Sequence, residues 1–150
     1  MDIDDFGLLE LTISTFIGFL SALVVEYLAE RLREAKDSQK ALIGVADELG
    51  TIRDTIRSLK DTEYYLDPLE TPVWDSLVFG GGIAKLKLKK DIILTYRHVD
   101  RLNNWENVRT NSFFGTHTES AKLDEKVDNN REQVLAIVER TLSNLEDVIP

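Results

Sequence analysis

The sequence predicts an all-α protein, in which an N-terminal transmembrane helix continues into an antiparallel cytoplasmic bundle of three long helices and one short helix. First, the stretch from Leu11 to Val25 carries no charge. Second, apolar residues beyond it recur at steps of three and four, which is the helical period. Third, 150 residues include only 3 Pro and 8 Gly, so long helices are easily accommodated. We therefore divide the chain into residues 1–28, an acidic N-terminus with the span, and residues 29–150, the bundle.

Three interpretations of the apolar stretch compete. Residues 11–25 cover roughly 22 Å of helix, whereas residues 6–28 cover roughly 34 Å, enough for a hydrocarbon layer of about 30 Å. The only polar residues between Leu11 and Val25 carry hydroxyl groups, so the segment is apolar nearly all round. A signal peptide needs a basic start, but MDIDDFGLLE is acidic. We expect a membrane span, and a helix buried inside a soluble oligomer is the alternative.

Charges on either side of the span predict its orientation. No lysine or arginine precedes it, and Arg31, Arg33, Lys36 and Lys40 follow it. The positive-inside rule then places the N-terminus outside the inner or plasma membrane and residues 29–150 in the cytoplasm.

The span also carries a pattern that favours assembly. Ser14, Gly18 and Ala22 are spaced four residues apart and form one stripe of small residues on a helix. Such stripes let two helix backbones approach closely in lipid. We expect membrane lipid as one partner and a second copy of the chain as another.

Helix boundaries follow from periodicity and breakers. We expect helices over residues 6–60, 72–79, 83–109 and 119–148, with a break of the first near Asp37-Ser38. Residues Leu42, Val45, Leu49, Ile52, Ile56 and Leu59 form an apolar seam on the first helix. Thr71 and Pro72 are typical of a helix start, and Gly80-Gly81-Gly82 of a helix end. The alternation in IAKLKLK suggests a strand, but without a partner strand we favour helix.

Net charge is −9, which argues against a duplex nucleic-acid binder. The segment from Ile83 to Thr110 is locally basic, with seven basic and three acidic residues. At its start, Gly80, Gly81 and Gly82, which precede the segment, together with Lys85 and Lys89 form a candidate ligand site. A glycine-rich turn that enters a helix exposes N–H groups, and two lysines one turn apart hold a phosphate. An anionic nucleotide is the expected ligand, and a simple break between helices is the alternative.

No catalytic or metal-binding pattern is present. The chain lacks cysteine, and its two histidines, His98 and His117, belong to no ligand motif. We expect no enzyme activity, no metal and no cofactor. Trp74 is expected to plug the bundle, and Asn103 to be a buried hydrogen-bonding residue.

Residues 48–105 resemble a loose group of uncharacterised prokaryotic single-pass membrane proteins with a small cytoplasmic helical domain. The likeness rests on Glu48-Leu49, on TPVWDSL at residues 71–77, and on Ile92, Tyr96 and Leu102-Asn103. The resemblance implies an accessory or defence-associated setting and no transferable site.

The sequence thus predicts a non-enzymatic membrane protein that self-associates and binds a protein partner, as a receptor or a membrane effector does. A sensor of a nucleotide second messenger with a membrane output is the alternative.

Overall fold

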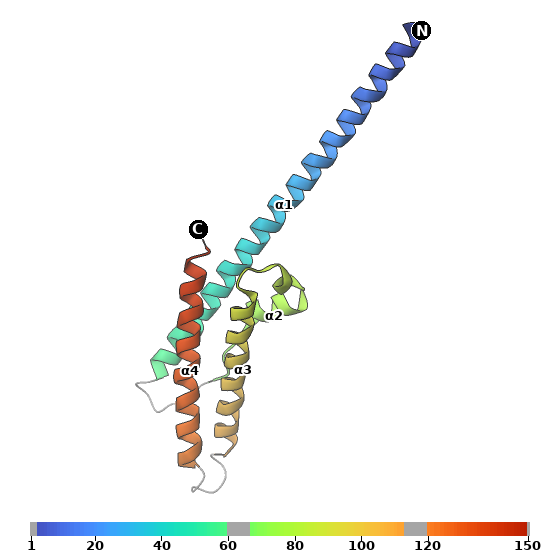
Figure 1. Ribbon diagram of the computed structural model, residues 1–150. Helices are drawn as coiled ribbons and strands as arrows, with labels where there is room; N and C mark the ends of the chain where they lie inside the picture. The colour runs from blue at the N-terminus through green and yellow to red at the C-terminus, as the bar shows by residue number, and fades with distance from the viewer. Residues whose placement is uncertain (1–2, 60–66, 113–119, 150) are drawn as a thin grey trace. The chain divides into compact units, whose positions relative to one another are not determined.

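A computed structural model describes residues 3–59, 67–112 and 120–149, and all of its regular elements are helices (Figure 1). Three are long: α1 (Ile3–Leu59), α3 (Lys89–Ser112) and α4 (Ser120–Glu146). One is short, α2 (Pro72–Phe79), and a 3₁₀ turn, η1 (Gly82–Lys85), follows it. The predicted all-α class, with three long helices and one short one, is confirmed.

The chain divides into two compact units, Met1–Asp37 and Ser38–Pro150. The division falls within α1, which continues through Asp37 and Ser38 without the predicted break. No proline or glycine lies near that point to interrupt the helical hydrogen bonds. The second unit begins at Ser38, whereas the predicted boundary between residues 28 and 29, which separates membrane from cytoplasm, stays a prediction.

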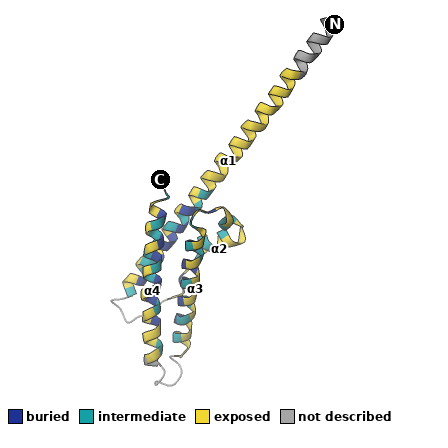
Figure 2. Ribbon diagram, viewed as in Figure 1, coloured by how far each residue is buried: buried dark blue, intermediate teal, exposed yellow. Residues whose placement is uncertain are grey.

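The core of the second unit lies between α1, α3 and α4, with α2 against one side (Figures 1 and 2). The predicted α1 seam is buried: Val45, Leu49 and Ile56 are fully inaccessible, and Leu59 is partly buried. Tyr96 and Val99 from α3 and Val138 from α4 meet this seam. The seam therefore serves the chain's own bundle. Burying such a seam is the main force that holds helices together in a bundle.

The prediction of one helix from Ile83 onward is wrong at its start. Leu86 is extended, with φ −77° and ψ 138°, and α3 begins only at Lys89. Leu86 is buried and Leu88 packs against the same core. Two residues at a spacing of two reach one surface from extended chain but not from a helix. Leu88 adopts a left-handed φ of 59°, and its carbonyl accepts the hydrogen bond that opens α3, from the Ile92 N–H.

Candidate functional site

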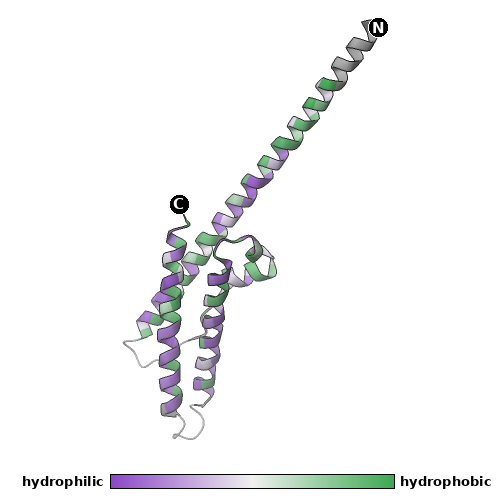
Figure 3. Cartoon of the chain, viewed as in Figure 1, coloured by the Kyte–Doolittle hydropathy of each residue, from purple (hydrophilic) through white to green (hydrophobic). Residues whose placement is uncertain are grey.

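The most distinctive surface of the chain is the apolar part of α1 within the first unit (Figures 2 and 3). From residue 13 to residue 32, every side chain is exposed. The large apolar members of this set are Ile13, Phe16, Ile17, Phe19, Leu20, Leu23, Val24, Val25, Tyr27, Leu28 and Leu32. They occupy all sides of the helix, so no single neighbouring helix in a monomer would cover them.

The length and composition of this segment suit a bilayer. A core helix of a soluble protein and a signal sequence share that length and composition. Burying one large apolar side chain gains about 1.5–3 kcal/mol. Leaving these eleven side chains in water therefore forgoes a burial free energy on the order of 10 kcal/mol or more. Some apolar medium, either lipid or other protein, must surround this helix.

Polar groups of the apolar segment bond locally. Ser21 Oγ donates to the Ile17 carbonyl at 2.8 Å, which satisfies the hydroxyl within its own helix. Near the end of the segment, Arg31 Nε donates to Tyr27 Oη at 3.0 Å, and the guanidinium lies 5.4 Å from the ring centroid. An aromatic ring next to a basic residue is typical of the boundary between hydrocarbon and headgroups.

The small-residue stripe lies on this same exposed surface. Ser14, Gly18 and Ala22 are all exposed, and a Cβ built on Gly18 would meet no described atom within 4 Å. The helix surface at Gly18 is therefore open to a neighbouring backbone.

The glycine triplet forms a compact turn between α2 and η1. Gly81 has a positive φ of 68°. A Cβ on Gly80 would lie 2.9 Å from the Ser76 carbonyl oxygen, and one on Gly82 would lie 2.9 Å from Leu77 Cδ2. Each glycine therefore has a structural role in the turn.

The two candidate lysines do not share a helix. Lys85 ends η1, whereas Lys89 opens α3 after the extended residue Leu86. The expectation that they lie one helical turn apart is therefore wrong. Both side chains are exposed, and the ligand site that includes them stays a prediction.

A polar junction that the sequence did not predict joins three helices around Glu48 of α1. Its Oε2 accepts the Val73 N–H at 2.7 Å, and its Oε1 accepts the Trp74 N–H at 3.2 Å. The Tyr96 hydroxyl of α3 donates to Oε1 at 2.5 Å. The predicted cap residue Thr71 makes no side-chain bond, because this carboxylate takes the N-terminal N–H groups of α2. We call Glu48, Val73, Trp74 and Tyr96 the Glu48 junction.

The Glu48 junction holds its three helices together through ring stacking as well as hydrogen bonds. The Trp74 and Tyr96 rings stack with centroids 4.5 Å apart and planes 7° apart. Burial and the adjacent carboxylate raise the pKa of Tyr96, so its hydroxyl stays protonated and continues to donate. Because Glu48 is only 8% exposed and already accepts three hydrogen bonds, it does not offer an oxygen to a substrate.

A second contact fixes the segment before α2. Asn103 Oδ1 accepts the Leu69 N–H at 2.8 Å, and Asn103 Nδ2 donates to the Leu69 carbonyl at 3.0 Å. The expectation of a hydrogen-bonding role for Asn103 is confirmed. Together with Trp74, which packs against the core, this amide holds α2 on the bundle.

A buried ionic cluster connects α3 and α4. Arg131 Nε donates to Glu106 Oε1 at 2.6 Å, and Arg109 lies 2.9 Å from Glu106 Oε2. Glu106 is 2% exposed. Asp124 and Asp128 approach the two arginines at 3.9 and 3.5 Å from the exposed side. The Glu106 cluster, defined as Glu106, Arg109 and Arg131, therefore pairs its buried carboxylate with two guanidinium groups.

The positions of Glu48 and Glu106 in the sequence indicate that both are buried. Glu48 lies three residues after Val45 and four before Ile52, on the apolar seam itself. Glu106 follows Leu102 by four and lies on the buried stripe of α3. A charged residue at an apolar stripe position must find a buried partner.

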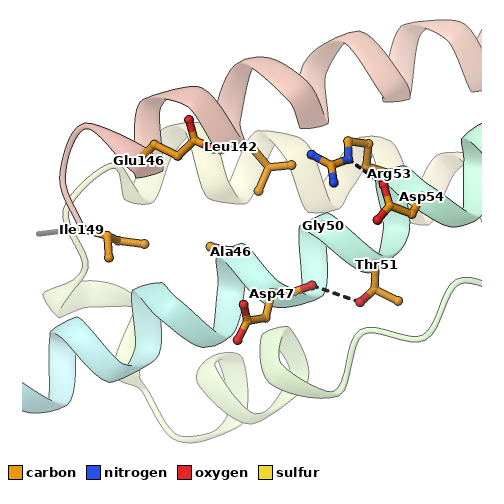
Figure 4. A pocket seen from close by; sticks show the side chains of 9 residues that line it. All are labelled: Ala46, Asp47, Gly50, Thr51, Arg53, Asp54, Leu142, Glu146 and Ile149. Atoms are coloured by element: carbon orange, nitrogen blue, oxygen red, sulfur yellow. Dashed lines mark hydrogen bonds and ion pairs between the residues drawn. The ribbon is translucent and has the colours of Figure 1, made fainter.

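An open groove of about 510 Å³ lies between α1 and α4 of the second unit (Figure 4). Ala46 and Gly50 line it on α1, and Leu142 and Ile149 line it on the other side. Its charged residues include Arg53, which pairs with Asp54 at 2.8 Å. Asp47 and Glu146 also line the groove.

Among the side chains that the structure describes, which exclude residues 1–12, 60–66, 113–121 and 150, no group of three His, Asp or Glu could hold a metal ion. His98 is half-buried on α3, and His117 lies outside the described residues. Comparisons with protein-family models, with curated proteins and with solved structures gave no match. The fold and these sites define an all-α protein with one helix that could cross a membrane.

Proposed function

We propose that this chain is a non-enzymatic, single-pass membrane protein whose helical bundle self-associates and binds a partner. The observation that carries the proposal is the contrast between its two units. The bundle buries its own apolar core, whereas the apolar part of α1 is exposed on every side. The bundle gains nothing from such a helix, so the helix serves lipid or another chain.

Lipid is favoured over a protein interior by the pattern of polar residues. A helix at the surface of a soluble oligomer presents a polar face to water, and a soluble helix that is apolar all round requires the centre of a large assembly. The only polar side chains of residues 13–25 are those of serine and threonine. The hydroxyl of one of them, Ser21, donates a hydrogen bond to a carbonyl of its own helix. A lipid-facing helix satisfies its polar groups in this way.

Orientation follows from the charges that flank the segment. Arg31, Arg33, Lys36 and Lys40 are all exposed. We propose that they face the cytoplasm, with the acidic N-terminus outside the inner or plasma membrane.

We further propose that assembly uses Ser14, Gly18 and Ala22. Open space around Gly18 supports this, because a partner backbone could approach there without a clash. Since α1 is one helix from Ile3 to Leu59, partner binding at the bundle would be transmitted to the span through the same helix. This arrangement suits a receptor or a membrane effector.

Cysteine scanning tests the topology directly, because the natural chain contains no cysteine. Single variants Asp4→Cys and Ser38→Cys would be expressed in cells and treated with a membrane-impermeant maleimide. We expect labelling at position 4 in intact cells, and at position 38 only after permeabilisation. Labelling of both positions only after lysis would contradict the proposed span.

Self-association is tested by the size of the full chain in mild detergent. Gly18→Leu should shift the oligomer towards monomer, whereas Leu20→Phe, on the opposite face of the helix, should leave it unchanged. Equal sizes for all three proteins would place the contact outside the stripe.

The nucleotide-sensor alternative is less well supported. Its two lysines lie on separate elements, and each glycine of the triplet has a local structural role. A thermal-shift titration with cyclic and linear nucleotides tests it, and we expect no shift.

A further inference from the structure

The surface formed by the end of α2 and the segment after it combines exposed apolar and basic side chains. Phe79 is 89% exposed, the highest value of any large apolar residue in the described chain, and Val78 beside it is 45% exposed. In water, an outward-facing phenylalanine at a helix end contributes nothing to folding and adds apolar surface. Together with Val78 it forms a small apolar patch at the end of α2.

Four lysines accompany this apolar pair. Lys85, Lys87, Lys89 and Lys90 are exposed, and residues 76–90 include no acidic residue. Residues 76–90 therefore carry a net charge of +4. Because the whole chain carries −9, the rest of the chain carries −13. The lysines therefore form a local basic field that the composition of the protein does not explain.

The apolar and basic parts are close in space and firmly held. α2 packs against η1, and η1 packs against the start of α3. At its other end, α2 is fixed by Glu48 and by the stacking of Trp74 on Tyr96. We call Val78, Phe79 and the four lysines the α2–η1 surface.

We propose that the α2–η1 surface binds an anionic lipid membrane. Phe79 and Val78 would enter the headgroup region, and the lysines would contact lipid phosphates. An exposed aromatic side chain next to a lysine cluster is the combination that holds proteins on acidic bilayers. The cytoplasmic leaflet carries such lipids.

Lipid fits this surface better than a small anion does. A free phosphate or nucleotide would need a concave site with converging donors. Phe79 instead presents its ring outward, and Lys85 and Lys89 lie on different elements. A flat, charged layer of headgroups contacts all four lysines without requiring them to converge.

This inference rests on the proposed membrane anchoring in one respect. A bundle tethered to a bilayer meets that bilayer at a high effective concentration, so a weak surface contact becomes populated. Binding of the α2–η1 surface to lipid is otherwise a separate event, and it can be measured separately.

The experiment uses the full chain with an environment-sensitive fluorophore on one introduced cysteine. Val78→Cys reports on the α2–η1 surface and leaves Phe79 in place. Phe19→Cys reports on the apolar segment of α1, and Asn107→Cys on an exposed position of α3. Each protein is reconstituted in phosphatidylcholine vesicles with or without phosphatidylglycerol, and quenching by nitroxide-labelled lipid is measured.

We expect the probe at 78 to shift to the blue and to lose emission to the lipid quencher only when phosphatidylglycerol is present. Replacing the four lysines with glutamine, or Phe79 with Ser, should abolish both effects. The probe at 107 should remain water-like throughout.

A water-like probe at 78 in anionic vesicles, or equal quenching in both lipid mixtures, would overturn the inference. So would a blue shift at 78 produced by ATP or inorganic phosphate without lipid, because that result indicates a small-anion site. The probe at 19 separates the two proposals: if it is not quenched in either mixture, the membrane span fails, and the result at 78 still decides the surface contact.

Discussion

The Tyr96 hydroxyl of α3 donates a hydrogen bond of 2.5 Å to the Glu48 carboxylate of α1, and the same carboxylate caps α2. One side chain thus connects three helices that are far apart in sequence. A carboxylate that receives several donors away from water is stabilised by each of them. Val73, Trp74 and Tyr96 meet Glu48 at this junction, and Asn103 forms the neighbouring Leu69 contact.

We predict that Glu48→Ala destabilises the bundle by about 3 kcal/mol, because two N–H groups of α2 and the Tyr96 hydroxyl lose their acceptor. Tyr96→Phe should cost about 1 kcal/mol, since it removes a single donor. Urea unfolding followed by circular dichroism measures both. Asp54→Asn, an exposed change on the same helix, should stay within about 0.5 kcal/mol of wild type. A similar small effect for Glu48→Ala would disprove the role of the junction.

For the Glu106 cluster, we predict that one substitution lowers the free energy of unfolding more than three combined substitutions do. Glu106→Gln leaves two buried guanidinium groups without their carboxylate and should cost about 3–5 kcal/mol. Replacing the whole cluster with apolar residues, Glu106→Leu with Arg109→Met and Arg131→Met, should cost less than that single change. Unfolding midpoints compare the two proteins directly, and a triple variant less stable than Glu106→Gln would contradict the prediction.

Two glycines of α1 form a matched pair. A Cβ on Gly50 would meet no described atom, whereas one on Gly44 would lie 3.2 Å from Val73 Cγ1. Gly50→Ala should therefore stabilise the protein by about 0.5–1 kcal/mol through helix propensity. Gly44→Ala gains the same propensity but crowds α2, so its benefit should be smaller or reversed. Equal gains at both positions in thermal melts would show that α2 does not pack on α1 as described.

The Asp100 carboxyl predicts a pH-dependent effect. Partial desolvation of this mostly exposed carboxyl and then the nearby Asp75 raise its pKa, so the folded protein favours the protonated form. Its contribution to stability is therefore present below about pH 3.9, the ordinary value for aspartate, and is lost as pH rises through the raised pKa.

Asp100→Asn should consequently stabilise the protein at pH 7, by no more than about 0.5 kcal/mol because the side chain is exposed, and give no gain in acid. Unfolding at both pH values checks this, with Asp67→Asn as the exposed control. A gain that is larger in acid than at pH 7 would have the wrong sign.

Helix positions were predictable because their signals are local. Periodicity gave α1 and α4, and Pro72 and the glycine triplet gave the bounds of α2. The start of α3 was missed because Leu86 and Leu88 both reach the core, and this tertiary demand overrides helix propensity. No local signal identifies such a demand.

For the buried polar contacts, the sequence identifies the charged residues but not their partners. Position alone marks Glu48, Glu106 and Arg131 as charged residues on apolar stripes. Their partners depend on which helices are neighbours, and a single sequence does not give that. The pairing of the Glu48 carboxylate with the N-terminus of α2 therefore required the fold.

The central claim is that lipid surrounds the apolar part of α1, and extraction of membranes from cells that express the full chain tests it most directly. We expect the protein to remain in the membrane pellet after alkaline carbonate treatment and to be released only by detergent. A variant with Ile17→Lys and Leu20→Lys should lose this behaviour. Recovery of the unmodified chain in the detergent-free supernatant, as a dispersed particle, would contradict the claim.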